Sequence, residues 1–410
     1  MKILFVNNIG TMHGGTEIMI AQLRRELEKK GHMVRILAGD EASNGKTIAD
    51  WRFKTFSDNS ILKFLYIYNP FAIWKLWVTL RQFRPDIVHM HNVSKASPLI
   101  FLVARRYPTI LSIHDYTAFD PTRFKDITTL APYDKTLSGY FTNTPSPRFY
   151  LEKVRFWLYR RYCKSIDLVL ACSDFYCLCA KQSKLFTRVV TLHDGIVLTK
   201  TKPIQKWHHL LFVGRLEEIK GADILLRALP KILIKNPKLH LYIVGSGPQM
   251  SYLKKLTEEL RIGNMVKFLG FQSHRQIMSL YYKTTLVVIP SLCPESFGLV
   301  GIEAFGSGRP VIATRVGGIP EWLDDGKTGF LVEPGNSEQI AEKVTQLLSD
   351  RKLLQQMGKN ARKKAEQYSI KIHADEIEKK YKLFFHPYVK GFPKYKEKDY
   401  KKHHAEIGME

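Results

Sequence analysis

Acidic residues are scarce in this sequence. The chain has 410 residues, and its 38 Asp and Glu side chains are outnumbered by 63 Lys and Arg, which gives a formal net charge of +25 at pH 7. An excess of this size indicates an anionic partner, such as a phosphate-bearing molecule, an anionic lipid surface or a nucleic acid. The basic residues are spread along the chain and form no recognisable nucleic-acid-binding module, so we expect no nucleic acid partner.

Cysteine is also scarce, with five residues. An odd number at this spacing fits neither a disulfide framework nor a zinc site, and we predict buried thiols in a reducing cytosol. Cys177 and Cys179 are expected on one helix, where residues two positions apart point about 200° apart and cannot share a metal ion.

Long apolar runs are missing as well. The most apolar segment, residues 61–80, is interrupted by two lysines, an asparagine and a proline, so no run of about 20 apolar residues can span a bilayer. The apolar run Ile3–Val6 is too short for the core of a signal peptide. We therefore expect a cytoplasmic protein that is soluble or lies peripherally on the inner face of the plasma membrane.

Short apolar runs alternate with helical patterns along the chain, which is typical of parallel sheets covered by helices on both faces. The expected strands are 3–6, 34–38, 87–91, 109–113, 168–172, 210–213, 239–244, 266–269, 286–290 and 310–314. The expected helices between them are 17–30, 222–235, 249–260 and one from about 301. The pattern predicts an α/β fold with two similar units, and chemistry in the cleft where the strand ends face each other.

The pattern also predicts the domain boundaries. It breaks at residues 199–206, which we interpret as a linker between an N-terminal domain (1–200) and a C-terminal domain (201–368). Ser369 is a suitable cap for a further helix, assigned to 369–388, which we expect to cross back to the N-terminal domain. Residues 389–410 form a basic tail, and residues 116–147 show little periodicity, as expected of a functional loop.

Gly14 and Gly15 lie between the first predicted strand and the first predicted helix. Glycines at such a junction let a ligand approach the backbone, and the free N–H groups of the helix start favour an anion. The pair is equally compatible with a tight turn capped by Thr16, and this alternative remains open.

Two cations, Arg215 and Lys220, lie at the end of one predicted strand and at the start of the next helix. A guanidinium fork and an ammonium point charge in such a place suit a diphosphate. The alternative is a set of ordinary surface ion pairs with Glu217 and Glu218.

Two carboxylates, Glu295 and Glu303, lie in a loop after a predicted strand and inside the helix that follows it. Together they suit hydrogen bonds to the hydroxyl groups of a polar ligand, and Gly298 between them frees backbone N–H groups for a phosphate. The alternative for Glu303 is a carboxylate in the first helical turn that is stabilised by the helix dipole.

The same residues belong to a series of motifs that runs in order over residues 1–370. The series is Gly14-Gly15-Thr16-Glu17, Asp86-Ile87-Val88-His89-Met90-His91, Ile113-His114-Asp115-Tyr116, Gly214-Arg215 with Lys220-Gly221, Gly245-Ser246-Gly247-Pro248, Glu295-x7-Glu303, Gly308-Arg309-Pro310 and Gly317-Gly318-Ile319-Pro320-Glu321. This ordered set resembles the retaining family 4 glycosyltransferases (glycosyl transferases group 1). The resemblance implies the GT-B fold, in which two Rossmann-like, doubly wound domains face each other across a cleft.

The resemblance also implies roles for individual residues. Arg215 and Lys220 would neutralise the diphosphate leaving group, Glu295 would contact the donor sugar, and Glu303 would hold the ribose. The residues expected to support the donor through their backbones are Gly14, Gly15, Gly245, Gly247, Gly298 and Leu299. His114 would touch the sugar near the reaction centre, and its alternative is a strand-end histidine bonded to the backbone.

Two details near His114 complete these expectations. We expect His89 and His91 to point to opposite faces of their strand, so that at most one faces the cleft. The sequence His193-Asp194-Gly195-Ile196 departs from the Asn-Gly-Ile/Val-Asp more often seen in the family, with Leu198 near the place of its aspartate.

The activity implied is transfer of a hexose from a nucleotide-diphosphate sugar to an acceptor glycan or lipid-linked glycan, without a metal or other cofactor. A basic-aromatic helix at 153–164 suits an anionic membrane surface, with a packed helix of the N-terminal domain as the alternative. A small soluble acceptor and a non-catalytic sugar-nucleotide-binding protein remain as alternatives for the function.

Overall fold

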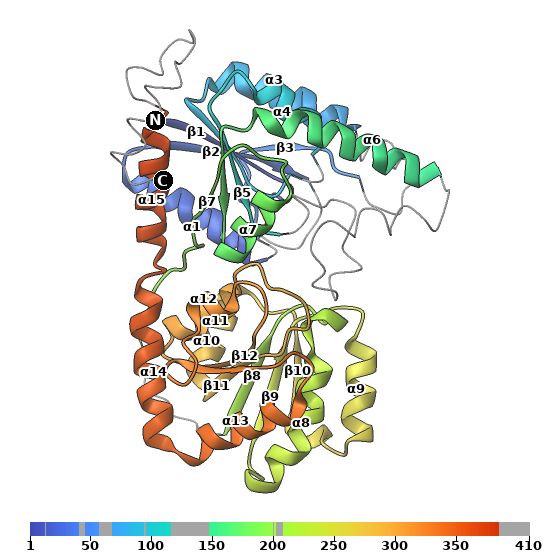
Figure 1. Ribbon diagram of the computed structural model, residues 1–410, viewed down its shortest axis with the longest axis vertical. Helices are drawn as coiled ribbons and strands as arrows, with labels where there is room; N and C mark the ends of the chain where they lie inside the picture. Colours follow the sequence, from blue (N-terminus) through green and yellow to red (C-terminus); the bar gives the residue numbers. More distant parts are fainter. Residues whose placement is uncertain are drawn as a thin grey trace.

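The computed structural model describes residues 1–12, 14–40, 46–56, 68–93, 96–115, 147–199, 201 and 208–384, with only the backbone for 147–153. The predicted loop at 116–147 lies outside these residues except for Pro147, which begins a helix. Most of the linker and the basic tail also lie outside them. The described chain forms two parallel sheets, each covered by helices on both faces (Figure 1). The predicted α/β class is therefore confirmed.

The N-terminal sheet has seven parallel strands within the described residues, in the order β3-β2-β1-β4-β5-β6-β7. They are β1 (Lys2–Asn7), β2 (Met33–Gly39), β3 (Trp51–Phe53), β4 (Ile87–Met90), β5 (Thr109–Ile113), β6 (Leu168–Ala171) and β7 (Val189–Thr191). The chain order reverses between β1 and β4, which are hydrogen-bonded neighbours. Ligands of open α/β sheets bind at such a switch point, beyond the carboxyl ends of the strands.

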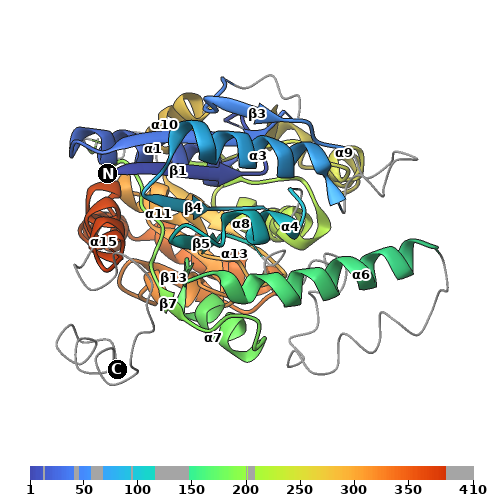
Figure 2. The same cartoon turned by 90° about the horizontal axis from the view of Figure 1, so that it is seen from above.

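Helices cover both faces of the N-terminal sheet. They are α1 (Gly15–Lys29), α3 (Pro70–Phe83), α4 (Leu99–Ala104), α6 (Pro147–Tyr162) and α7 (Asp174–Gln182). Side chains alternate along β1, so Phe5 packs in one core cluster with α1, whereas Leu4 packs in another with α3 and α4. Figure 2 shows α3, α4 and α6 together in the layer on the outer face.

The C-terminal domain repeats this plan with a six-stranded parallel sheet in the order β10-β9-β8-β11-β12-β13. Its strands are β8 (His209–Val213), β9 (His240–Val244), β10 (Val266–Gly270), β11 (Leu286–Ile289), β12 (Val311–Thr314) and β13 (Gly329–Val332). Its helices are α8 (Ala222–Lys235), α9 (Met250–Glu259), α10 (His274–Lys283), α11 (Leu299–Gly306), α12 (Ile319–Trp322) and α13 (Ser337–Ser349). Here the switch point lies between β8 and β11.

Two final helices join the domains along one side of the molecule (Figure 1). Helix α14 (Arg351–Glu366) packs on α11, and α15 (Ile370–Lys382) packs on α1. The side chain of Ser369 accepts a hydrogen bond from the backbone of Ile372 and begins α15. The predicted return of the last helix to the N-terminal domain is confirmed.

The cysteines are free thiols, and α7 carries both Cys177 and Cys179. Burial raises the pKa of Cys163 to about 12 and the pKa values of Cys179 and Cys293 to about 11, as expected of unreactive thiols. Within the described part of the chain, no helix is both long enough and apolar enough to cross a bilayer.

Candidate active site

Three charged side chains meet at the C-terminal switch point, on the loops that follow β8 and β11. The Nζ atom of Lys220 donates a hydrogen bond to Oε1 of Glu295 at 2.6 Å, and Ser291 donates its hydroxyl to the same oxygen. Arg215 is close enough to act electrostatically on both members of this pair, and its own side chain bonds Glu217. Arg215 therefore forms the surface ion pair with Glu217 that the sequence offered as an alternative. Lys220 does not, because it is paired with Glu295.

The ion pair keeps both of its members charged. Burial raises the pKa of a carboxyl group, but the Lys220 ammonium, helped by the Ser291 hydroxyl and Arg215, outweighs burial and lowers the pKa of Glu295 below its ordinary value. Burial likewise disfavours the charged lysine, but Glu295 raises the pKa of Lys220 above its ordinary value. A fixed, partly desolvated positive charge is therefore ready at this site before any ligand binds.

Gly221 explains how the Lys220 loop comes so close to the end of β11. Its φ is +64°, and a Cβ atom there would lie 2.0 Å from the carbonyl oxygen of Pro290. Only glycine fits this contact. The backbone N–H of Leu292 then donates to the carbonyl of Ile219 at 2.8 Å and ties the two loops together.

The loop after β9 is held against the loop after β8 by two further glycines. A Cβ atom on Gly245 would lie 1.8 Å from the carbonyl oxygen of Gly214, and one on Gly247 would lie 2.4 Å from that of Leu216. These contacts give both glycines a structural role, and their contact with a donor nucleotide stays a prediction. The surface hollow beside this loop is lined by carboxylates such as Glu217 and Asp223, which would repel a diphosphate.

Glu303 lies beyond the first turn of α11, and its side chain is only 14% exposed. The hydroxyl of Tyr281 donates to its Oε2 at 3.0 Å, and Nε2 of His274 lies 3.4 Å from its Oε1. Burial raises the pKa of Glu303 to about 7. The alternative of a first-turn carboxylate stabilised by the helix dipole is wrong, because α11 has no acidic residue in its first turn.

Sequence reasoning missed both residues that face Glu303. His274 and Tyr281 lie seven positions apart on α10, which places them on the same side of that helix. The backbone of Tyr281 is in turn held by Arg309, whose Nε donates to its carbonyl at 2.8 Å. The motif Gly308-Arg309-Pro310 thus supports Glu303 indirectly.

The glycines of the N-terminal domain lie at the domain boundary. Gly14 is the N-cap residue of α1, and the carboxylate of Glu17 accepts a hydrogen bond from its backbone N–H at 3.0 Å. The turn is therefore not capped by Thr16. A Cβ atom on Gly15 would lie 3.2 Å from Cδ1 of Leu299, so the start of α1 touches the start of α11 in the other domain.

His114 lies at the end of β5 with both ring nitrogens paired. Its Nδ1 is 3.2 Å from Oδ2 of Asp194, and its Nε2 is 3.1 Å from Nδ1 of His91. The backbone-bonded alternative is wrong, because these partners are side chains. Electrostatic coupling between His114 and Glu17 also places this cluster near the start of α1.

The expectation for His89 and His91 is also wrong. Their rings stack, with centroids 4.3 Å apart, and both pack edge-on against Phe5. Side chains alternate with a period of two along a strand, so residues two positions apart share a face. His89 also bonds the hydroxyls of Ser112 and Tyr381, which ties α15 to the sheet.

Asp194 is the carboxylate with the largest effect on the pKa of His114. Burial lowers the pKa of His114, but the carboxylates of Asp194, Asp115 and Glu17 together outweigh this effect, so that the pKa lies above its ordinary value. We expect Asp194→Asn to lower the pKa of His114 below its ordinary value, as measured by NMR titration of labelled histidine. Asp86→Asn, which removes an exposed carboxylate of the same domain, is the control. Unchanged titration of His114 in Asp194→Asn would contradict the assignment.

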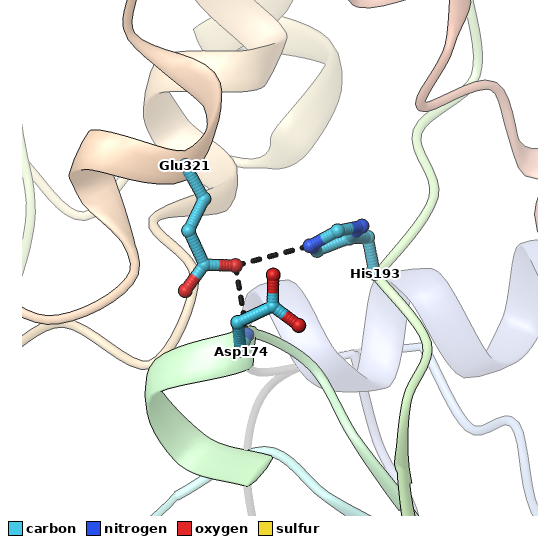
Figure 3. A group of neighbouring side chains, drawn as sticks. All are labelled: Asp174, His193 and Glu321. Atoms are coloured by element: carbon cyan, nitrogen blue, oxygen red, sulfur yellow. Dashed lines mark hydrogen bonds and ion pairs between the residues drawn. The ribbon is translucent and has the colours of Figure 1, made fainter. Parts of the chain in front are cut away.

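Glu321 joins the two domains near this cluster (Figure 3). Its carboxylate accepts hydrogen bonds from the backbone N–H groups of Asp174 and Phe175 and from Nε2 of His193, at 2.8–3.0 Å. One possible ligand atom each of Asp174, His193 and Glu321 lies within 4.8 Å of the other two, within reach of a metal ion. Because Glu321 already holds N–H donors on both oxygens, we interpret the group as a cap on α7 supplied by the C-terminal domain.

The two glycines that precede Glu321 support the candidate site directly. A Cβ atom on Gly317 would lie 2.2 Å from the carbonyl oxygen of Glu295, and the N–H of Gly318 donates to that oxygen at 2.9 Å. In the motif that runs from Gly317 to Glu321, the two glycines therefore position the Glu295 loop, and Glu321 bonds the N-terminal domain.

Family comparisons agree with the motifs on both domains. The family model described as Glycosyltransferase Family 4 matches residues 13–203, and the one described as Glycosyl transferases group 1 matches residues 200–364. The chain belongs to glycosyltransferase family 4. Its structure is similar to that of sucrose-phosphate synthase from Thermosynechococcus elongatus, with a TM-score of 0.75 and 20% identity over 94% of this chain and 99% of that one. It is also similar to the structure of Anabaena HepE in complex with UDP-glucose, with a TM-score of 0.69 and 23% identity over 93% of this chain and 100% of that one. These likenesses show the GT-B fold.

Sequence relatives with curated names match part of this family 4 chain. A D-inositol 3-phosphate glycosyltransferase of Corynebacterium jeikeium is 36% identical over 177 residues, which is 42% of either chain. A glycogen synthase of Mycobacterium tuberculosis is 28% identical over 297 residues, 70% of this chain and 66% of that protein. The match to the first relative thus covers less than half of its length.

Proposed function

We propose that this chain is a retaining glycosyltransferase that moves a hexosyl group from a nucleotide-diphosphate sugar to an acceptor hydroxyl and forms an α-glycosidic bond. The observation that carries the proposal is the half-buried ion pair of Lys220 and Glu295, with Arg215 beside it, at the switch point of the C-terminal sheet. Membership of family 4 and the activities for which the relatives are named support it. The structural neighbour HepE has been solved with UDP-glucose, which agrees with a nucleotide-sugar donor.

The chemistry follows from the charges. As the bond between the sugar C1 and the diphosphate oxygen breaks, negative charge grows on the leaving diphosphate, where the Lys220 ammonium and the Arg215 guanidinium stabilise it. The acceptor oxygen forms the new bond to C1 on the same face of the sugar, and its proton passes to the leaving phosphate oxygen. Glu295 accepts hydrogen bonds from sugar hydroxyls, and Glu303 accepts them from the ribose. The two cations serve in place of a metal ion or other cofactor.

The acceptor we propose is a glycan or lipid-linked glycan of cell-envelope polysaccharide or glycolipid biosynthesis, held by the N-terminal domain. A small soluble acceptor is the second candidate. It is favoured by the names of the inositol-phosphate and sucrose-phosphate relatives, which specify small phosphorylated molecules.

The direct test is release of nucleoside diphosphate from UDP-, GDP- and ADP-sugars, with and without acceptors of each class. We expect one donor to be used and release to depend on the acceptor. Binding of a nucleotide sugar without any acceptor-dependent release would refute the enzyme and leave a sugar-nucleotide-binding protein.

The pKa of Glu303, raised to about 7 by burial, predicts a pH dependence of donor binding. Below pH 7 the carboxyl group carries a proton, and above it the carboxylate can accept hydrogen bonds from both ribose hydroxyls. We therefore expect the Kd of the free nucleoside diphosphate, measured by calorimetry, to fall as pH rises from 6 to 8. Glu303→Gln is expected to flatten this dependence. An equally steep dependence in that variant would assign it to another group.

A further inference from the structure

Helix α3 exposes aromatic side chains on the side that faces away from the core. Its buried side consists of Ala72, Leu76, Thr79, Leu80 and Phe83. On the opposite side Phe71, Trp74 and Trp77 are 46%, 60% and 44% exposed. We call these three residues the aromatic face of α3. A surface helix of a soluble domain normally carries charged and polar residues there, so this face indicates a contact with another apolar phase.

The aromatic face forms one row along the helix, because its residues lie three positions apart. Arg81 continues the row, and its guanidinium lies 4.0 Å from the centroid of the Trp77 ring. At the other end, the ring of Phe56 lies 6.0 Å from that of Phe71, and the ammonium of Lys54 lies 5.7 Å from the Phe56 ring. A basic side chain therefore flanks the aromatic row at each end.

The surroundings of the aromatic face are positively charged. Helix α3 contacts α4, and α4 contacts α6, so the three helices form one outer layer (Figure 2). The exposed basic residues on these helices and just beyond them are Arg81, Arg84, Arg105, Arg106, Arg160, Arg161 and Lys164. Between residues 59 and 114 the sequence holds a single acidic residue, Asp86, which accepts a hydrogen bond from the backbone of Lys2.

Helix α6, for which the sequence left both a membrane surface and a packed position open, is the weaker candidate. It buries Phe156, Leu158 and Tyr159, and the Tyr159 ring packs edge-on against Phe101. These contacts match the alternative of a packed helix in the N-terminal domain. Trp157 is 63% exposed and adds one more aromatic side chain to the outer layer.

We propose that the aromatic face of α3 docks this protein on an anionic lipid surface. Tryptophan and phenylalanine on one side of a helix, with Lys and Arg beside them and no acidic residue, match the chemistry of the headgroup region. Tryptophan is favoured there because its ring is apolar and its N–H is polar. The other side of α3 is packed in the core, so the helix lies flat on the membrane. It lies on the side of the N-terminal domain remote from the C-terminal domain (Figure 1).

The test uses the full chain and lipid vesicles, without donor or acceptor, so that its result is independent of the proposed transferase activity. Vesicles of phosphatidylcholine with phosphatidylglycerol are compared with vesicles of phosphatidylcholine alone. We expect the chain to sediment with the anionic vesicles, its tryptophan emission to shift to the blue, and added salt to weaken the binding. The double variant Trp74→Ala/Trp77→Ala is expected to lower the partition coefficient about tenfold or more.

Two controls separate docking from loss of structure. Ile234→Ala removes a side chain that is 81% exposed on α8 of the other domain, and we expect it to bind vesicles like the unaltered chain. Trp74→Phe/Trp77→Phe is expected to retain most of the binding. The proposal fails if the unaltered chain does not sediment, or if the double alanine variant sediments equally well. It also fails if the chain binds neutral vesicles as strongly as anionic ones. A further contradicting result is a dimer of the unaltered chain in ultracentrifugation with a monomeric double variant, because the aromatic face would then be a protein interface.

Discussion

Replacement of Lys220 by alanine is expected to lower turnover about 100-fold or more. The ammonium lies 2.6 Å from Glu295 in a partly desolvated site, where it would stabilise the charge that grows on a departing diphosphate. Turnover is measured as acceptor-dependent release of nucleoside diphosphate at saturating donor. Arg215→Ala is expected to have an effect of similar size, because its 58% exposed side chain can leave Glu217 and reach the diphosphate.

The Lys220 variant also leaves the half-buried Glu295 carboxylate without its cation. Because loss of one partner costs about 3–5 kcal/mol in a fully buried pair, we expect a loss of about 1–3 kcal/mol at this partly solvated site. The double variant Lys220→Met/Glu295→Gln removes both charges, and we expect it to recover thermal stability without recovering turnover. Lys231→Ala is the matched control, since Lys231 forms an exposed pair with Glu338 in the same domain. Near-normal turnover in Lys220→Ala and Arg215→Ala would refute the leaving-group assignment.

The substitution Gly245→Ala is expected to lower the free energy of unfolding of the C-terminal domain by about 3 kcal/mol or more. The backbone of Gly245 has a φ of +136°, and its new Cβ atom would lie 1.8 Å from the carbonyl oxygen of Gly214. The strain of a positive φ accounts for about 1–2 kcal/mol, and the two loops must separate to relieve the clash. The expected fall in Tm is about 6 °C or more. Donor binding is expected to weaken as well, because the loop that carries Arg215 is displaced.

Gly263→Ala is the matched control for this prediction. Gly263 lies in the same domain without a positive φ, and no heavy atom lies within 4 Å of the position that its Cβ atom would take. We expect its Tm to change by no more than a degree or two. Equal Tm values for the two variants would show that the close approach of the two loops is not required.

The alternation of apolar runs and helices was sufficient to predict the strands β1, β2, β4, β5 and β6 of the N-terminal sheet. The same periodicity failed for His89 and His91, because we assigned opposite faces to residues two positions apart. Short elements such as β3 and β7 were also missed, since three residues carry too little periodicity to be recognised.

Side-chain partners within the candidate site were less accessible from sequence. Asp194 was noted only as a departure from the family pattern, yet it is the carboxylate that pairs with His114, 80 positions earlier in the chain. The sequence did contain a signal for this pair, because Asp194 is a carboxylate at a position where the family more often has an amide.

The sequence by itself determined that the chain forms two α/β units and that glycines and charged residues follow the ends of their strands. Both features are local, since they depend on the periodicity of a strand or helix and on the conformational freedom of glycine. The tertiary structure alone decided which charged groups meet. Lys220 and Glu295 lie 75 positions apart but become neighbours because β8 and β11 are adjacent at the switch point. Adjacency of strands depends on the packing of the whole sheet, and no local pattern in the sequence encodes it.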